Sequence, residues 1–367
     1  MTGVSTAAPE FSPAAAVFGL LFLGFLAASL SAWIWFFADL KKIRHWSGWR
    51  WDRPASSIGL IDLVAFFCCI LISQVVAVVA VRLFLAGDAS RQITIPAPDT
   101  SDPAQEASGA GVPAWVAPIL SLSYLVAFAL AVGWITLRSG ATLRQLGITS
   151  DERKRDVQVG VLSFLLITPV VLVFSGVVNA VTEVEYQHPV INAMREHPWT
   201  FPILFFGAVI CAPLWEEFAF RGLLIRWLDS IRSSGGNMRV IFFGRNSLSS
   251  TMAVNTDSPE ILSQTLDGTP TAAPISPSSQ KSDSTIDLRS SNELEVYPPW
   301  WPAIVSGIAF GLAHFAYGIS WLPLIFLGTI LGRIFQLRRS ILPCVVIHAC
   351  FNALSMLGLA SQILSGK

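Results

Sequence analysis

Residues 199–228 read WTFPILFFGAVICAPLWEEFAFRGLLIRWL, a long apolar stretch with charged residues inside it. About 20 predominantly apolar residues are enough for a helix to cross the hydrocarbon core of a bilayer. The innermost charges belong to Glu216, Glu217 and Arg221, and such side chains cost about 2.5–3.5 kcal/mol each on insertion scales. The stretch therefore predicts a membrane-spanning helix that carries a polar functional site.

The composition of the whole chain also points to a bilayer environment. Of the 367 residues, 53% are hydrophobic and 13% are charged, against about 45–50% and about 25% in soluble globular domains. The net charge is zero, so we predict no nucleic-acid partner. All five cysteines fall in apolar runs without a CxxC spacing, so we expect buried apolar side chains rather than disulfides or metal ligands.

Eight apolar runs are long enough to be membrane spans, and polar segments connect them. We therefore expect an all-α fold, a polytopic transmembrane helical bundle of about eight spans. The predicted spans are residues 13–38, 58–86, 114–137, 157–182, 199–228, 299–318, 320–338 and 341–364.

The connecting segments alternate in their content of Lys and Arg. Basic residues gather in 39–54, in 138–156 and again just before the last span, whereas 87–113 and 183–198 are poor in them. Connections rich in Lys and Arg stay on the cytoplasmic side of a membrane. The pattern predicts a multi-pass integral protein of the cell (inner) membrane, with both termini outside.

One long segment interrupts the series of spans. Residues 229–298 are rich in Ser, Thr, Pro, Asp and Asn and have no sustained periodicity, which is typical of a disordered segment, here a cytoplasmic insertion. We assign residues 1–156 to N-terminal transmembrane helices and loops. Residues 157–228 and 299–364 together form a second helical bundle, which contains the charged stretch.

The charged residues of this stretch have a definite helical arrangement. Glu217 and Arg221 are four residues apart, so they share one helix face and can form an ion pair. Glu216 points about 100° away from Glu217 around the same helix. We expect Arg221 to hold one carboxylate while the other carboxylate faces a cavity.

Two later spans contribute three further polar residues. His314 follows Phe310 by four residues in one span, and His348 and Asn352 share a helix face in the last span. Taken alone, His314 is as typical of a hydrogen-bonded packing residue as of catalysis, and an isolated pair such as His348 and Asn352 more often joins packed helices. Together with the paired glutamates, they supply from three helices the groups that hydrolysis needs.

Two chemistries fit these residues. In one, a carboxylate and a histidine polarise a water molecule as general base, and the second histidine and the amide donate to the oxyanion of a tetrahedral intermediate. In the other, the same Glu and His side chains hold a zinc-type ion, which lowers the pKa of its bound water. The spacing alone does not separate them.

The motifs Glu216-Glu217-xxx-Arg221, Phe310-xxx-His314 and His348-xxx-Asn352 resemble, in this order, those of the CPBP family. This family contains the type II CAAX prenyl endopeptidases and the bacteriocin-processing or self-immunity (Abi) proteins. The resemblance covers roughly residues 199–360 without the insertion.

The resemblance implies an intramembrane endopeptidase that acts on membrane-embedded or lipid-modified peptides. It implies that Glu216 and His314 activate the water, that His348 and Asn352 build the oxyanion site, and that Glu217 and Arg221 support them. The family has been described both as metalloprotease and as metal-independent glutamate protease. A divalent ion of the zinc type held by Glu216, His314 and His348, and no metal at all, therefore stay as alternatives.

Two other functions compete with the peptidase. One is a non-catalytic membrane immunity or scaffold protein of the same fold, against which the intact motifs argue. The other is a transporter or channel, which is expected to carry charges along several helices and to show repeated halves. Here the polar residues cluster in one half of the chain, without an internal repeat.

The expected depths of the site residues differ along the membrane normal. At a rise of about 1.5 Å per residue, Glu216 and His348 fall about 5–15 Å below the cytoplasmic surface of a core about 30 Å thick. His314 falls about 20 Å deep if its helix starts at Trp300. A tilted helix, or one that starts above the membrane, would bring the three side chains level.

Overall fold

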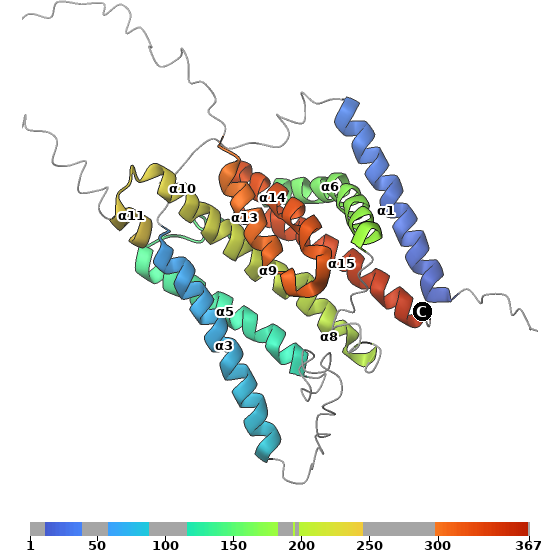
Figure 1. Ribbon diagram of the computed structural model, residues 1–367, viewed down its shortest axis with the longest axis horizontal. Coiled ribbons are helices and arrows are strands. Elements are labelled where there is room, and N and C mark those ends of the chain that lie inside the picture. The colour runs from blue at the N-terminus through green and yellow to red at the C-terminus, as the bar shows by residue number, and fades with distance from the viewer. Residues whose placement is uncertain are drawn as a thin grey trace, which may run out of the picture.

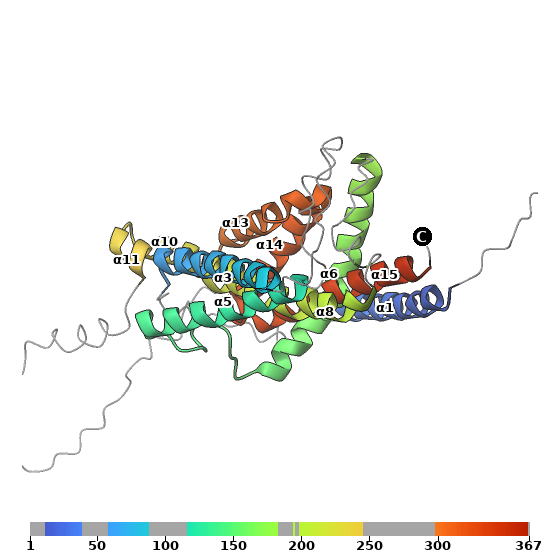
Figure 2. The ribbon, with the colours of Figure 1, turned by 90° about the horizontal axis from the view of Figure 1, so that it is seen from below.

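The computed structural model describes residues 12–38, 58–87, 116–182, 194, 198–244 and 298–365. Over these residues the chain is helical and contains no strand. The hairpin of α13 (Trp301–Leu312) and α14 (Trp321–Arg338) lies in the middle, with the helix that runs from α8 (Phe201–Phe206) to α10 (Arg226–Ser233) (Figure 1). Helices α3 (Leu60–Gly87) and α5 (Val116–Ser139) lie on one side, and α1 (Pro13–Ala38), α6 (Arg153–Thr182) and α15 (Leu342–Leu364) lie on the other (Figure 1 and Figure 2). The predicted all-α fold is confirmed.

Among the described residues, seven helices are long and apolar enough to cross a membrane, which makes the chain a multi-pass integral membrane protein. Their bounds lie within a few residues of the predicted spans. Six of them are α1 Pro13–Ala38, α3 Leu60–Gly87, α5 Val116–Ser139, α6 Arg153–Thr182, α14 Trp321–Arg338 and α15 Leu342–Leu364.

The seventh span, Pro198–Ser233, is one continuous helix whose winding changes along its length. Two π-helical segments flank the short helix α9 Ala212–Glu217, which carries both glutamates. The remaining pieces are η1 Pro198–Thr200, α8 Phe201–Phe206, η2 Gly207–Cys211, η3 Phe218–Ile225 and α10 Arg226–Ser233.

The helix predicted over residues 299–318 is shorter than expected. Helix α13 covers Trp301–Leu312, 12 residues, which rise about 18 Å and cannot cross a core of about 30 Å alone. Ala313 and His314 leave the helix, and a 3₁₀ segment, η4 Phe315–Ser320, leads into α14. Gly318 has a φ of 74°, a conformation that glycine adopts readily and that turns the chain back.

Helices α13 and α14 pack closely because small residues face each other. A methyl group added to Gly307 would lie 2.5 Å from the backbone nitrogen of Thr329, and one added to Gly311 would lie 2.7 Å from the carbonyl oxygen of Trp321. Across the interface, a Cβ on Gly328 would come within 3.0 Å of the Gly307 Cα. Small residues spaced four apart allow two membrane helices to approach to backbone contact.

Part of the segment predicted as a disordered insertion is helical. The helix α10 extends to Ser233, beyond the predicted end of the span, and a second short helix, α11 Met238–Phe243, follows. The side chain of Asn237 accepts a hydrogen bond from the Arg239 N–H and so caps the start of α11. Residues 245–297 of the predicted insertion lie outside the described residues.

We expect Gly307→Ala to lower the free energy of unfolding by about 1–3 kcal/mol, because its methyl group would overpack the α13–α14 interface. Thermal unfolding of the purified protein in detergent measures the change. Gly133→Ala is the matched control, since among the described residues no atom beyond the backbone of its own helix lies within 4 Å of its added methyl group. Equal unfolding temperatures for the two variants would contradict the close packing described above.

Candidate active site

The helix that carries Glu216 and Glu217 is tied to α15 at its first π-helical segment. In η2 the N–H of Ala212 bonds to the carbonyl of Gly207, and the next residue, Pro213, has no N–H to give. The carbonyl of Ala208 therefore has no donor within its own helix. The side-chain amide of Asn352 on α15 donates to it at 2.8 Å.

The second π-helical segment is tied to α13 in the same manner. The hydroxyl of Ser306, which is fully buried, donates to the carbonyl of Phe220 in η3 at 2.9 Å. Short π-helical segments inside α-helices are often found at functional sites. Here η3 accepts a hydrogen bond from α13, which precedes His314, and η2 accepts one from α15, which carries His348.

A buried network of three side chains forms the base of the site. Arg221 Nη1 donates to Glu217 Oε1 at 3.0 Å, which confirms the predicted pairing. His348 Nδ1 donates to the same oxygen at 2.8 Å. Glu217 and Arg221 are fully buried and His348 is 4% exposed. Since charges removed from water must be paired, each partner depends on the others.

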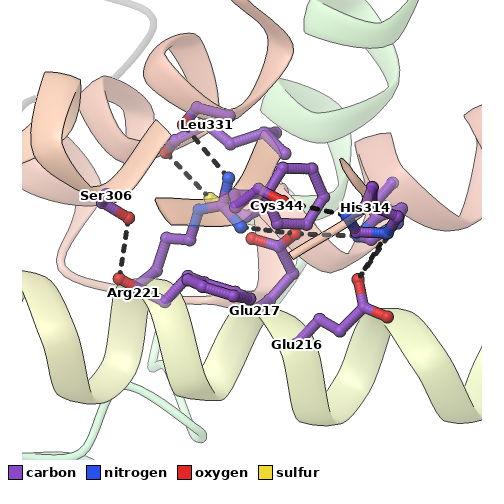
Figure 3. Close-up of polar contacts among 11 residues, drawn as sticks. Glu216, Glu217, Arg221, Ser306, His314, Leu331 and Cys344 are labelled. Atoms are coloured by element: carbon purple, nitrogen blue, oxygen red, sulfur yellow. Dashed lines mark hydrogen bonds and ion pairs between the residues drawn. The ribbon is translucent and has the colours of Figure 1, made fainter. Parts of the chain in front are cut away.

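Arg221 is held further by groups from both helices of the hairpin. Its Nη2 donates to the carbonyl of Gly328 at 3.0 Å, and its guanidinium lies 4.6 Å from the centroid of the Phe310 ring. The Phe310 ring also meets the His348 ring edge to face, with centroids 5.5 Å apart. Figure 3 shows Arg221 reaching between the helices from the same side as Glu217.

Glu216 faces both histidines. Its Oε2 lies 3.9 Å from His314 Nε2 and 3.8 Å from His348 Nε2, and Figure 3 shows the carboxylate turned toward His314. This oxygen is buried and has no hydrogen-bond partner among the described residues. The side chain of His314 is 24% exposed, which makes it the most accessible of the three.

The hydrogen bonds of the two rings decide which nitrogen meets Glu216. His314 Nδ1 lies 2.8 Å from the carbonyl oxygen of Phe310, which can only accept, so Nδ1 carries the proton. His348 Nδ1 donates to Glu217 in the same sense. In both rings Nε2 is therefore the nitrogen that faces Glu216.

The structure brings together five of the six predicted site residues, Glu216, Glu217, Arg221, His314 and His348, despite the expected difference in depth. The sixth, Asn352, lies on the His348 face of α15 but directs its amide to Ala208. The motifs did not include Ser306 or Gly328, and they included Phe310 without indicating the contacts of its ring and carbonyl with Arg221 and His314. A serine inside a Gly-rich apolar helix was the available signal for Ser306.

The donor types suit a zinc-type ion, but their spacing does not. Ligands about 2.0–2.2 Å from a tetrahedral zinc lie roughly 3.3–3.5 Å apart, whereas Glu216 Oε2 is 3.8 and 3.9 Å from the two Nε2 atoms. Within the described part of the chain, no group of three or more His, Cys, Asp and Glu side chains is arranged to hold a metal ion. The same separations leave room for a water molecule bonded at about 2.8 Å to both Oε2 and an Nε2.

Comparison with known proteins finds a similarity over the part of the chain that contains this site. Residues 198–257 and 287–354 match the family described as type II CAAX prenyl endopeptidase Rce1-like. The match includes all six predicted site residues and agrees with the resemblance to the CPBP family. No curated protein and no solved structure matches the chain significantly.

Replacing Ser306 with Ala should lower the free energy of unfolding by about 1–3 kcal/mol, because the buried carbonyl of Phe220 loses its side-chain donor. Ser355→Ala is the matched control. Its hydroxyl is exposed and bonds to the carbonyl of Phe351 in its own helix, so we expect a change within about 0.5 kcal/mol. Chemical denaturation in detergent compares the two, and a neutral Ser306→Ala would contradict the assigned contact.

Proposed function

We propose that this chain, a multi-pass membrane protein with an Rce1-like domain, is an intramembrane endopeptidase that hydrolyses peptide bonds with a water molecule activated by Glu216 and histidine. The observation that carries the proposal is the buried oxygen of Glu216, which has no hydrogen-bond partner in the described part of the chain and faces two imidazole nitrogens. A buried carboxylate is retained at such a cost where it takes part in chemistry.

The first step is attack by water on the scissile carbonyl. The water lies between Glu216 and His314, and Glu216 removes its proton as the water oxygen bonds to the carbonyl carbon. His314 orients the water through Nε2, because its Nδ1 proton is committed to the carbonyl of Phe310. The partial exposure of the His314 side chain gives water a path to this position.

The second step is stabilisation and collapse of the tetrahedral intermediate. Protonated at Nε2, His348 donates to the oxyanion, and the second amide hydrogen of Asn352 contributes from the same helix face. Glu216 then returns the proton to the leaving nitrogen, the carbon–nitrogen bond breaks, and a carboxylic acid and an amine are released; the proton of the new acid passes to the amine in water, giving a carboxylate and an ammonium group. No proton is gained or lost by the site over the cycle.

Glu217 and Arg221 act through His348. With His348 protonated, the two carboxylates of Glu216 and Glu217 balance the positive charges of Arg221 and His348, so the site is neutral overall. Glu217 keeps the proton of the His348 ring on Nδ1 and stabilises the imidazolium that holds the oxyanion. Arg221 prevents Glu217 from becoming an unpaired buried charge.

The substrate class follows from where the site lies. A site within membrane-spanning helices suits peptides that reach it from the bilayer, so we propose membrane-associated or lipid-modified peptide tails as substrates, as the CAAX endopeptidase family suggests. We propose the cell membrane as location, with both termini outside, on the distribution of Lys and Arg.

We expect Glu216→Gln to abolish cleavage, with a loss of at least about 100-fold, because the amide cannot accept the proton of water. The purified protein is incubated in liposomes with a library of lipid-anchored peptides, and products are read by mass spectrometry. Asp151→Asn, whose side chain is 56% exposed, is the matched control and should retain activity.

Cleavage by Glu216→Gln at the wild-type rate, with unchanged thermal stability, would remove Glu216 from the mechanism. If no peptide of any lipid type were cleaved by the wild type, a non-catalytic immunity or scaffold role would replace the peptidase.

Strong chelators should leave the cleavage rate unchanged, because the spacing of Glu216, His314 and His348 fits a water molecule better than an ion. The rate is measured after exhaustive treatment with EDTA and with 1,10-phenanthroline, and the metal content of the protein is determined in parallel. Loss of cleavage that added zinc restores would show that these three residues hold a metal.

A further inference from the structure

The short helix α11 presents an apolar surface that no described part of the chain covers. Met238, Phe242 and Phe243 are 60%, 43% and 52% exposed. Two exposed basic residues, Arg232 at the end of α10 and Arg239 within α11, lie close to them in the chain. Apolar side chains combined with basic ones are typical of elements that lie in the headgroup region of a bilayer.

The position of α11 is fixed by contacts with three helices. A helix of six residues is not stable alone, and its terminal carbonyls need donors from elsewhere. Trp227 Nε1 on α10 donates to the carbonyl of Ile241 at 3.1 Å. Arg138 Nη1 on α5 donates to the carbonyl of Phe243 at 2.9 Å.

A glycine and a buried ion pair complete the attachment. The backbone of Gly59, just before α3, lies so close to α11 that an added Cβ would be 2.4 Å from the carbonyl oxygen of Phe242. Arg138 Nε also donates to Asp62 at 2.7 Å, and Asp62 is fully buried. These contacts hold α11 in one orientation, with its apolar side chains outward.

The attachment points mark the ends of two membrane spans. Gly59 precedes the span Leu60–Phe84, and Arg138 is in the last turn of the span Leu122–Ser139. The first span has 25 residues and a length of about 37 Å, so it extends past a hydrocarbon core of about 30 Å. Both ends, and α11 between them, therefore fall at the level of the lipid headgroups.

We propose that α11 is a membrane-surface anchor: Met238, Phe242 and Phe243 insert into the headgroup–acyl boundary, and Arg232 and Arg239 contact the phosphates of anionic lipids. Because α11 is bonded to α10, which continues the helix of Glu216 and Glu217, the anchor fixes the end of that helix to the bilayer surface. The proposal does not depend on peptidase activity.

Photo-crosslinking identifies what covers α11. The full-length protein is prepared with p-benzoyl-phenylalanine in place of Phe242 or of Phe243 and reconstituted into liposomes of phosphatidylcholine and phosphatidylglycerol. Leu20, which is 70% exposed in a span, serves as the lipid-facing control position, and Asp151 as the water-facing one. Variants that keep the wild-type unfolding temperature are irradiated and analysed by mass spectrometry.

We expect adducts heavier by one phospholipid at positions 242 and 243, with a yield close to that at Leu20, and none at Asp151. Crosslinks to peptides of residues 245–297 would show that the chain itself covers α11, and crosslinked dimers would show that a second copy does. Either result overturns the proposal. So does the absence of any adduct at both positions while Leu20 reacts, because α11 would then face water.

Discussion

The buried ion pair between Glu217 and Arg221 is the interaction on which the rest of the site depends. Both side chains are fully buried, and removal of one partner from such a pair costs about 3–5 kcal/mol. The same carboxylate oxygen accepts from His348. This ion pair therefore fixes the orientation of the His348 ring, and the ring orientation places His348 Nε2 beside Glu216.

The backbone of the surrounding helices supports this pair. Arg221 reaches the carbonyl of Gly328, and Gly328 itself can lie against Gly307 on the opposite helix because it has no side chain: an added Cβ would be 3.0 Å from the Gly307 Cα. The two π-helical segments then connect the glutamate helix to α13 through Ser306 and to α15 through Asn352. Close packing and these hydrogen bonds to backbone carbonyls together bring three separate helices to one point.

Much of this arrangement could be predicted from the sequence. The long apolar runs predicted the membrane-spanning helices, because a helix must have a minimum length to cross a bilayer. The spacing of Glu217 and Arg221 predicted an ion pair, because residues four apart share a helix face. The structure confirms this pair. The early end of α13 was missed, since Ala313 and His314 leave the helix in an apolar run without proline.

Other features depend on tertiary structure that the pattern of residues does not contain. Pro213 interrupts the hydrogen bonds of the helix at the start of α9, but the sequence does not indicate the second π-helical segment after α9, or that Asn352 directs its amide to Ala208. The position of α11 likewise depends on Gly59, Trp227 and Arg138, which are far apart in the chain. Polar composition predicted disorder there, while contacts with three helices impose order.

The central claim is that both imidazole rings are held through Nδ1, so that their Nε2 atoms meet Glu216. Nitrogen NMR of the protein labelled with ¹⁵N-histidine tests this directly, because the chain contains only five histidines and single replacements assign them. The account predicts a protonated Nδ1 in both His314 and His348. A ring at either position that carries its proton on Nε2 alone, with Nδ1 bare, would contradict it.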